Sequence, residues 1–160
     1  MFEVFGNMDS AEEINKTAEG LKNEGDKDSL YKLAEENGID KGFAEMYLAG
    51  IAPFLCDVAT AAVGKLILEA NELKAKELIA DWIEYIKVSC MEDEELARAV
   101  RCKNKSMKEC LAELMKWSYK NMYEIPKDVA KAAGINANVK FGIPGMRQAK
   151  NIIRKYYLGK

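Results

Sequence analysis

Basic side chains near the end of the chain have the types and spacings that would bind an anionic partner. Lys108, Lys116 and Lys120 follow one another at intervals of eight and four residues, which aligns them along one edge of a helix. A second basic group would cover the outer face of the last helix, and the two helices packed side by side would form one surface. The candidate partner-binding or nucleic-acid-binding residues are Arg101, Lys103, Lys105, Lys108, Lys116, Lys120, Arg147, Lys150, Arg154 and Lys155.

The charge of the chain is distributed unevenly along its length. Residues 1–57 contain 5 Lys+Arg against 13 Asp+Glu, and residues 58–100 contain 5 against 9. Residues 101–160 contain 14 against 4, so the overall net charge of −2 hides a strongly basic last third. This excess is larger than solubility requires and favours a polyanion or an acidic protein surface as partner. The alternative is that these cations are solvated, or pair with Glu109, Glu113 or the acidic N-terminal region.

The residue types that enzymes use for nucleophilic catalysis are missing or poorly placed. The chain has no histidine, which excludes the usual Ser-His-Asp and Cys-His arrangements. Four consecutive acidic residues, Glu92 to Glu95, lie at a predicted helix start. Their carboxylates diverge, so they suit the helix dipole rather than a metal ion. We therefore expect no enzymatic activity, no metal and no cofactor.

The four cysteines are not spaced like a metal or redox motif. Cys56, Cys90, Cys102 and Cys110 are 34, 12 and 8 residues apart, and without histidine a zinc site would need all four thiolates. Each lies on or beside an apolar helical stripe, where a free cysteine behaves as a small hydrophobic side chain. We expect buried structural thiols.

The turn at residues 142–145, with the sequence Gly-Ile-Pro-Gly, precedes the last predicted helix. Free backbone N–H groups there, together with Arg147, could hold an anion such as phosphate. The alternative is a turn that needs these residues only for its geometry. The two tryptophans, Trp82 and Trp117, lie on apolar stripes and are expected to anchor the core.

Helices would position all of these residues, because apolar side chains recur at intervals of three and four almost throughout. We predict an all-α fold, a single bundle of about seven or eight helices, with a small helical hairpin at the N-terminus as an option. The hairpin outlines a helix-turn-helix, but its acidic second helix would repel DNA phosphates. In detail, Asp28 or Ser29 would cap the second helix, Phe43 and Met146 would face the core, and the helix containing Trp82 would begin near Leu73.

Length and composition fit one domain, or one domain with a small appendage. Residues 50–53, Gly-Ile-Ala-Pro, mark the expected boundary between an acidic N-terminal helical region, 1–52, and a main helical bundle, 53–160, with a basic last third. The N-terminus lacks the pattern of a signal peptide, and the most apolar stretch, 51–68, is too interrupted to cross a bilayer. We expect a soluble cytoplasmic protein without a membrane partner.

Two blocks of the sequence are similar to small helical proteins carried on conjugative elements of gut Firmicutes. The first block is residues 90–121 and the second is residues 141–159. Within the first, the segment Lys-Ser-Met-Lys-Glu-Cys at 105–110 resembles the PcfK-like group, which includes inhibitors of the type II CRISPR effector nuclease. This resemblance implies an accessory or anti-defence protein that binds a nucleic-acid-handling machine, such as a nuclease or a conjugation component.

Two functions therefore remain as expectations. The first is a non-enzymatic interaction protein of a mobile genetic element, which binds and inhibits or modulates a nucleic-acid-handling machine. The alternative is direct, sequence-tolerant nucleic-acid binding through the basic C-terminal surface. The sequence leaves open whether the chain forms a homo-oligomer, and whether the basic or the acidic region makes the contact. An acidic face could imitate DNA in a basic channel through Asp9, Glu12, Glu13, Glu19, Glu35, Glu36 and Glu45.

Overall fold

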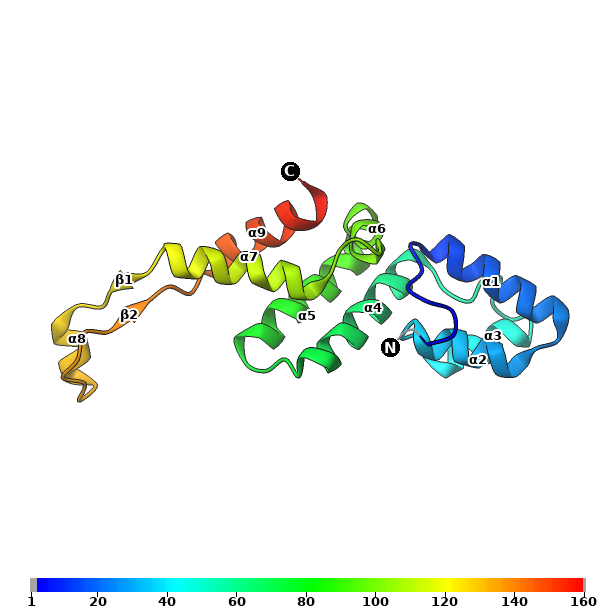
Figure 1. Cartoon of the computed structure of the whole chain (residues 1–160), viewed down its shortest axis with the longest axis horizontal. Helices are drawn as coiled ribbons and strands as arrows, with labels where there is room; N and C mark the ends of the chain where they lie inside the picture. Colours follow the sequence, from blue (N-terminus) through cyan, green and yellow to red (C-terminus); the bar gives the residue numbers. More distant parts are fainter. Residues whose placement is uncertain (1–2, 160) are drawn as a thin grey trace. The chain divides into compact units, whose positions relative to one another are not determined.

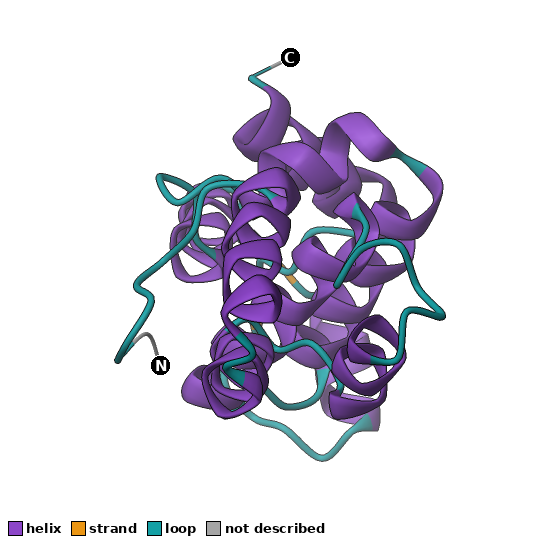
Figure 2. Cartoon of the chain, turned by 90° about the vertical axis from the view of Figure 1, so that its right-hand side faces the viewer, coloured by secondary structure: helices purple, strands orange, loops and turns teal. Residues whose placement is uncertain are grey.

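The computed structural model describes residues 3–159, and within them the fold is all-α, as predicted. One pair of two-residue strands accompanies nine helices in this described range, and Figure 2 shows how little of the chain is strand. None of the helices in this range is both long and apolar enough to cross a membrane. The elements, labelled in Figure 1, are α1 (Ala11–Glu24), α2 (Lys27–Glu36), α3 (Lys41–Leu48), α4 (Val58–Leu73), α5 (Leu78–Glu92), α6 (Glu94–Arg101), α7 (Met107–Lys120), β1 (Tyr123–Glu124), α8 (Lys127–Ala132), β2 (Lys140–Phe141) and α9 (Met146–Leu158).

The chain divides into two compact units that meet between Lys108 and Glu109. The residues before this point are called the N-terminal unit below, and the residues after it the C-terminal unit. The sequence predicted a boundary at residues 52 and 53, which lies inside the N-terminal unit.

Local capping residues set the ends of α1 and the start of α2. The Ser10 hydroxyl accepts a hydrogen bond from the N–H of Glu13 at 3.1 Å and begins α1, and Gly25, with φ of +74°, ends it in the left-handed conformation that glycine favours. The second helix is capped by Asp26 rather than by Asp28 or Ser29. The Asp26 carboxylate accepts from both the N–H and the hydroxyl of Ser29, at 3.0 and 2.7 Å, so Ser29 is the partner of the cap.

The core of the first three helices includes Ile14, Leu30 and Leu33, all fully buried. In α3 the inward residues are Ala44 and Tyr47, three positions apart. The prediction that Phe43 faces the core was wrong, because it precedes this stripe by one residue and its side chain is 41% exposed.

The turn between α2 and α3 contacts α4 backbone to backbone. A Cβ atom on Gly64 would collide with the carbonyl oxygen of Asn37, and a Cβ on Gly38 would collide with the carbonyl of Gly64. Asn15 of α1 adds a second connection, because its amide accepts from the N–H groups of Leu55 and Cys56, both at 3.1 Å. These contacts explain why residues before 52 belong to the same unit as α4–α6.

Helix α4 is the buried central helix that the sequence predicted, although Ile67 is 38% exposed. It packs against α5 and α6. The following helix, α5, begins at Leu78 and not near Leu73. Lys74 and Glu77 both have positive φ, 49° and 52°, which a right-handed helix does not allow, so the chain is not helical between Leu73 and Leu78.

The C-terminal unit contains most of α7, then β1, α8, β2 and α9. Figure 1 shows β1 and β2 side by side between the helices α7 and α9 and the short helix α8. Gly142 follows β2 at a point where a Cβ would collide with the carbonyl oxygen of Ser118, so glycine lets the chain cross the last turn of α7. In α9 the buried residues are Ala149, Ile153 and Tyr157, and Met146, predicted to face inward, is 46% exposed because it lies in the first turn.

Candidate polyanion-binding groove

An open groove of about 420 Å³ lies between α7 and α9 within the C-terminal unit. Both helices contribute a stripe of residues to it. The lining residues are Glu113, Lys116, Trp117 and Lys120 from α7, Asn121 directly after it, and Ile152, Lys155 and Tyr156 from α9.

The spacing of these residues explains why they share one groove. On α7 they follow intervals of three, one and three, with Asn121 one residue beyond the helix, and on α9 they follow intervals of three and one. Each set therefore forms a single helical stripe beside the buried stripe of its helix, which includes Leu114 on α7 and Ile153 on α9. The aromatic and aliphatic groups lie next to the core, and the lysines lie toward solvent.

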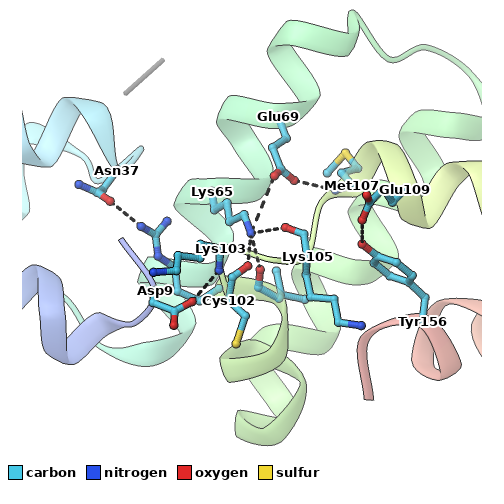
Figure 3. A network of polar contacts seen from close by, with 12 residues as sticks. Asp9, Asn37, Lys65, Glu69, Cys102, Lys103, Lys105, Met107, Glu109 and Tyr156 are labelled. Carbon is cyan, nitrogen blue, oxygen red and sulfur yellow. Dashed lines mark hydrogen bonds and ion pairs between the residues drawn. The ribbon is translucent and has the colours of Figure 1, made fainter. Parts of the chain in front are cut away.

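The two aromatic side chains of the groove, Trp117 and Tyr156, are half-buried. The Tyr156 hydroxyl donates to the Glu109 carboxylate at 2.8 Å, as Figure 3 shows, and its ring meets that of Tyr157 edge-on at 4.8 Å. Trp117 lies one turn before the end of α7, where its carbonyl accepts from the Asn121 side chain at 2.8 Å. The fixed ring of Tyr156 and the half-buried side chain of Trp117 therefore border the same hollow.

The cationic groups at the groove are exposed lysines. Lys116 forms an ion pair with Glu113 at 2.6 Å, and both side chains are largely exposed, at 65% and 45%. An exposed pair of this kind contributes less than about 1 kcal/mol, so it exchanges readily for another anion. Lys120 and Lys155 are also exposed. The groove thus combines ammonium groups with aromatic surface.

Three of the ten predicted site residues line this groove: Lys116, Lys120 and Lys155. Arg147, Lys150 and Arg154 are on the same helix as Lys155 but follow intervals of three and four, which places them on another side of α9. The basic residues of α9 therefore do not form one continuous surface with the groove.

Arg101 was wrongly assigned to the exposed surface, because its side chain is completely buried. It follows the buried Ala97 by four residues and so lies on the inward face of α6. Its Nη2 donates to the Asn37 side-chain oxygen at 2.6 Å, while Nε and Nη1 have no hydrogen-bond partner among the described residues. Burial lowers the pKa of this guanidinium. Arg101 is a structural residue of the N-terminal unit.

Lys103, Lys105 and Lys108 also belong to the N-terminal unit and lie outside the groove. The backbone N–H of Lys103 donates to the Asp9 carboxylate at 2.7 Å. The carbonyl of Lys105 accepts from the ammonium of Lys65 at 2.6 Å. The loop after α6 is therefore fixed through its backbone.

Lys65 is a buried charged residue that the sequence analysis did not identify. Its side chain is 1% exposed, and its ammonium donates to the carbonyl oxygens of Val100, Cys102 and Lys105 at 3.0, 2.6 and 2.6 Å (Figure 3). Burial lowers the pKa of Lys65, although the carboxylate of Glu69, 3.9 Å away, opposes this effect. A cation at this point satisfies the carbonyls that α6 leaves free at its C-terminus.

Glu69 completes this buried network. Its carboxylate accepts from the N–H of Met107 at 2.9 Å, at the first residue of α7. Burial raises the pKa of Glu69, and the Met107 N–H and the Lys65 ammonium both act in the opposite direction. A lysine alone in an apolar helix, followed by glutamate four residues later, is the sequence signal that indicates such a pair.

Among the residues that the structure describes, the acidic run at 92–95 and the cysteines have structural roles. Asp93, within the acidic run at 92–95, caps α6 by accepting from the N–H of Leu96 at 3.1 Å, so the interpretation as a helix start is confirmed. The cysteines are free thiols, and burial raises the pKa of Cys56 and of Cys90 to about 12. Cys102 is only half-buried, in contrast to the expectation for all four.

Comparison of this chain with protein-family models, with curated proteins and with solved structures finds no match in any of the three.

Proposed function

We propose that this protein is a non-enzymatic binding protein that holds a single-stranded nucleic acid in the groove between α7 and α9. The observation that supports this most strongly is the placement of half-buried Trp117 and Tyr156 among the exposed lysines 116, 120 and 155. Proteins that bind single strands without sequence preference combine aromatic rings, on which bases stack, with cations that follow the backbone.

The size of the groove favours an unpaired strand over a duplex. Its volume of about 420 Å³ lies within the range of pockets that hold one small ligand. An unstacked base of a single strand can enter such a hollow. The bases of a duplex cannot, because they stay stacked and paired within the double helix. The charge of the C-terminal unit agrees with this partner, because residues 109–160 contain 10 Lys+Arg against 4 Asp+Glu.

The experiment is a titration of a fluorescently labelled oligonucleotide, followed by anisotropy, at several salt concentrations. Each phosphate contact of a single strand contributes roughly 0.7 to the slope of log K against log salt, so three lysines predict a slope of about −2. Lys120→Glu and Lys155→Glu should each weaken binding and reduce this slope. Trp117→Ala should weaken binding by about 1–3 kcal/mol, the usual contribution of base stacking.

Arg147→Glu is the matched control for Lys155→Glu. It makes the same change of charge on the same helix, but Arg147 lies outside the groove. The control should retain most of the binding. Absence of binding at low salt, or equal losses in the two variants, would contradict the proposal.

A second candidate is an interaction protein of a mobile genetic element that modulates a cytoplasmic nuclease or relaxase. The observation that favours it is the charge of the N-terminal unit, where residues 1–108 contain 22 Asp+Glu against 14 Lys+Arg. Such an acidic unit would be attracted to the positively charged channel of a nucleic-acid-handling enzyme. Inhibition of the enzyme that survives Lys120→Glu would favour this candidate over the first.

A further inference from the structure

The segment that connects α7 to α9, residues 121–145, buries very little of its own apolar surface. This segment, called the arm below, contains β1, α8 and β2, and its buried residues are Ala130 and Pro144. Six large apolar side chains of the arm are exposed by 43% to 59%. They are Met122, Tyr123, Val129, Ile135, Phe141 and Ile143.

The two strands of the arm form a small amphipathic ladder. Tyr123 is paired with Phe141, and Glu124 is paired with Lys140. Because neighbouring residues of a strand point to opposite faces, the ladder has an aromatic face and a charged face. The charged face is satisfied internally, since Lys140 and Glu124 lie 3.8 Å apart. The aromatic face is exposed, with Tyr123 at 58% and Phe141 at 51%.

A two-stranded ladder is marginally stable in water unless something packs against its apolar face. The rings of Tyr123 and Phe141 would also gain from edge-on or offset contact with further aromatic rings, in addition to the burial of area. The exposed aromatic face is therefore the part of the arm that benefits most from a partner.

We propose that the aromatic face of this ladder is an interface with the same face of a second copy of the chain. The charge of the arm supports this partner, because the arm contains three lysines and two acidic residues and is nearly neutral. The remainder of the C-terminal unit is strongly basic, so a polyanion is attracted to the helices rather than to the arm. Across a twofold axis, Tyr123 of one copy would meet Phe141 of the other, and the two faces would be self-complementary.

The area available indicates a weak dimer. Tyr123 and Phe141 are each about half exposed and offer on the order of 100 Å² apiece, so the aromatic face itself offers roughly 200 Å² per copy. A standard interface buries about 800 Å² per partner. The dimer should therefore form as the protein concentration rises and dissociate on dilution.

Sedimentation equilibrium of the full chain over a wide range of concentration tests this interface. Phe141→Ser and Tyr123→Ser should each raise the dimer dissociation constant at least about tenfold. Phe54→Ser is the matched control, because Phe54 is also an exposed aromatic residue, at 63%, but lies in the N-terminal unit. It should leave the dissociation constant unchanged, and circular dichroism should show the same helix content in all three variants.

Salt distinguishes this interface from a contact between the acidic and basic units of two copies. An apolar interface keeps or gains affinity as salt is added, whereas a contact between opposite charges weakens. A protein that stays monomeric at every concentration would overturn the proposal. So would a dimer that dissociates with salt, or one that is lost equally in Phe54→Ser. Nucleic-acid binding by Phe141→Ser is measured separately, so that failure of the groove and failure of the interface can be told apart.

Discussion

Replacing Lys65 by methionine tests whether the buried ammonium holds the end of α6 and the loop that follows it. Methionine keeps most of the length of the side chain and its apolar contacts with the core, but it has no hydrogen to donate. Three carbonyl oxygens then lose the ammonium as a donor, those of Val100, Cys102 and Lys105. Glu69 loses its cation and keeps the bond from Met107 N–H.

The magnitude follows from which of these groups can reach water. The bond to Val100 is buried, whereas those to Cys102 and Lys105 are partly buried, so water can replace the ammonium only in part. Each hydrogen bond from a charged group stabilises the folded state by about 1.5–3 kcal/mol, and the variant loses these bonds. Part of this loss is offset, because folding of the variant no longer has to desolvate an ammonium. Breaking a buried pair by removing one partner costs about 3–5 kcal/mol. We expect Lys65→Met to lower the free energy of unfolding by about 3 kcal/mol.

Urea unfolding followed by circular dichroism measures this change, with fluorescence as a second probe of the transition. Lys41→Met is the matched control, because Lys41 also forms an ion pair four residues along its helix, with Glu45 at 3.7 Å, but is 73% exposed. The control should change stability by less than about 0.5 kcal/mol. If the two variants lose the same small amount, below about 1 kcal/mol, the role assigned to the Lys65 ammonium is refuted.

Three further predictions concern the N-terminal unit. Gly64→Ala should lower the free energy of unfolding by about 1–3 kcal/mol, because its Cβ would collide with the Asn37 carbonyl. Gly20→Ala, in open space on α1, should instead raise the free energy of unfolding by up to about 1 kcal/mol in the same urea assay. Arg101→Met should be neutral or stabilising in thermal unfolding, because it removes a buried charge with unpaired N–H groups, while Asn37→Ala should be destabilising because it removes the acceptor of that charge. Burial raises the pKa of Glu69 above 4.5, so the folded state binds this proton more tightly than the unfolded state and loses stability as pH rises through the folded pKa. Glu69→Gln should therefore gain stability relative to the native chain as pH rises through that window, and a constant difference in unfolding free energy from acid to neutral pH would contradict this.

The helices could be predicted from sequence wherever local signals determine them. Ser10 and Asp40, residue types that favour helix starts, cap α1 and α3, and the interval of four residues places Lys116 and Lys120 on one edge of α7. These features depend on residues a few positions apart, so a single sequence contains enough information.

What could not be predicted depends on contacts between distant residues. Lys65 and Arg101 look like ordinary helix charges until the fold places Val100 and Asn37 beside them, 35 and 64 residues away. The collision that requires Gly64 also involves a turn that is remote in sequence. Trp117 was expected in the core. It is only half-buried, and the placement of α9 beside α7 makes it line a groove together with Tyr156.

Quenching of tryptophan fluorescence tests the central proposal most directly, because the chain has two tryptophans and one of them lines the groove. Trp82 is 3% exposed and its Nε1 has no hydrogen-bond partner among the described residues, so Trp82→Phe removes it without losing a hydrogen bond. In this variant all of the tryptophan emission comes from Trp117. Titration with a single-stranded oligonucleotide at low salt should quench the emission to saturation, and Lys120→Glu combined with Lys155→Glu should abolish the quenching. Unchanged Trp117 emission while the oligonucleotide is bound would show that the strand lies elsewhere and would contradict the account.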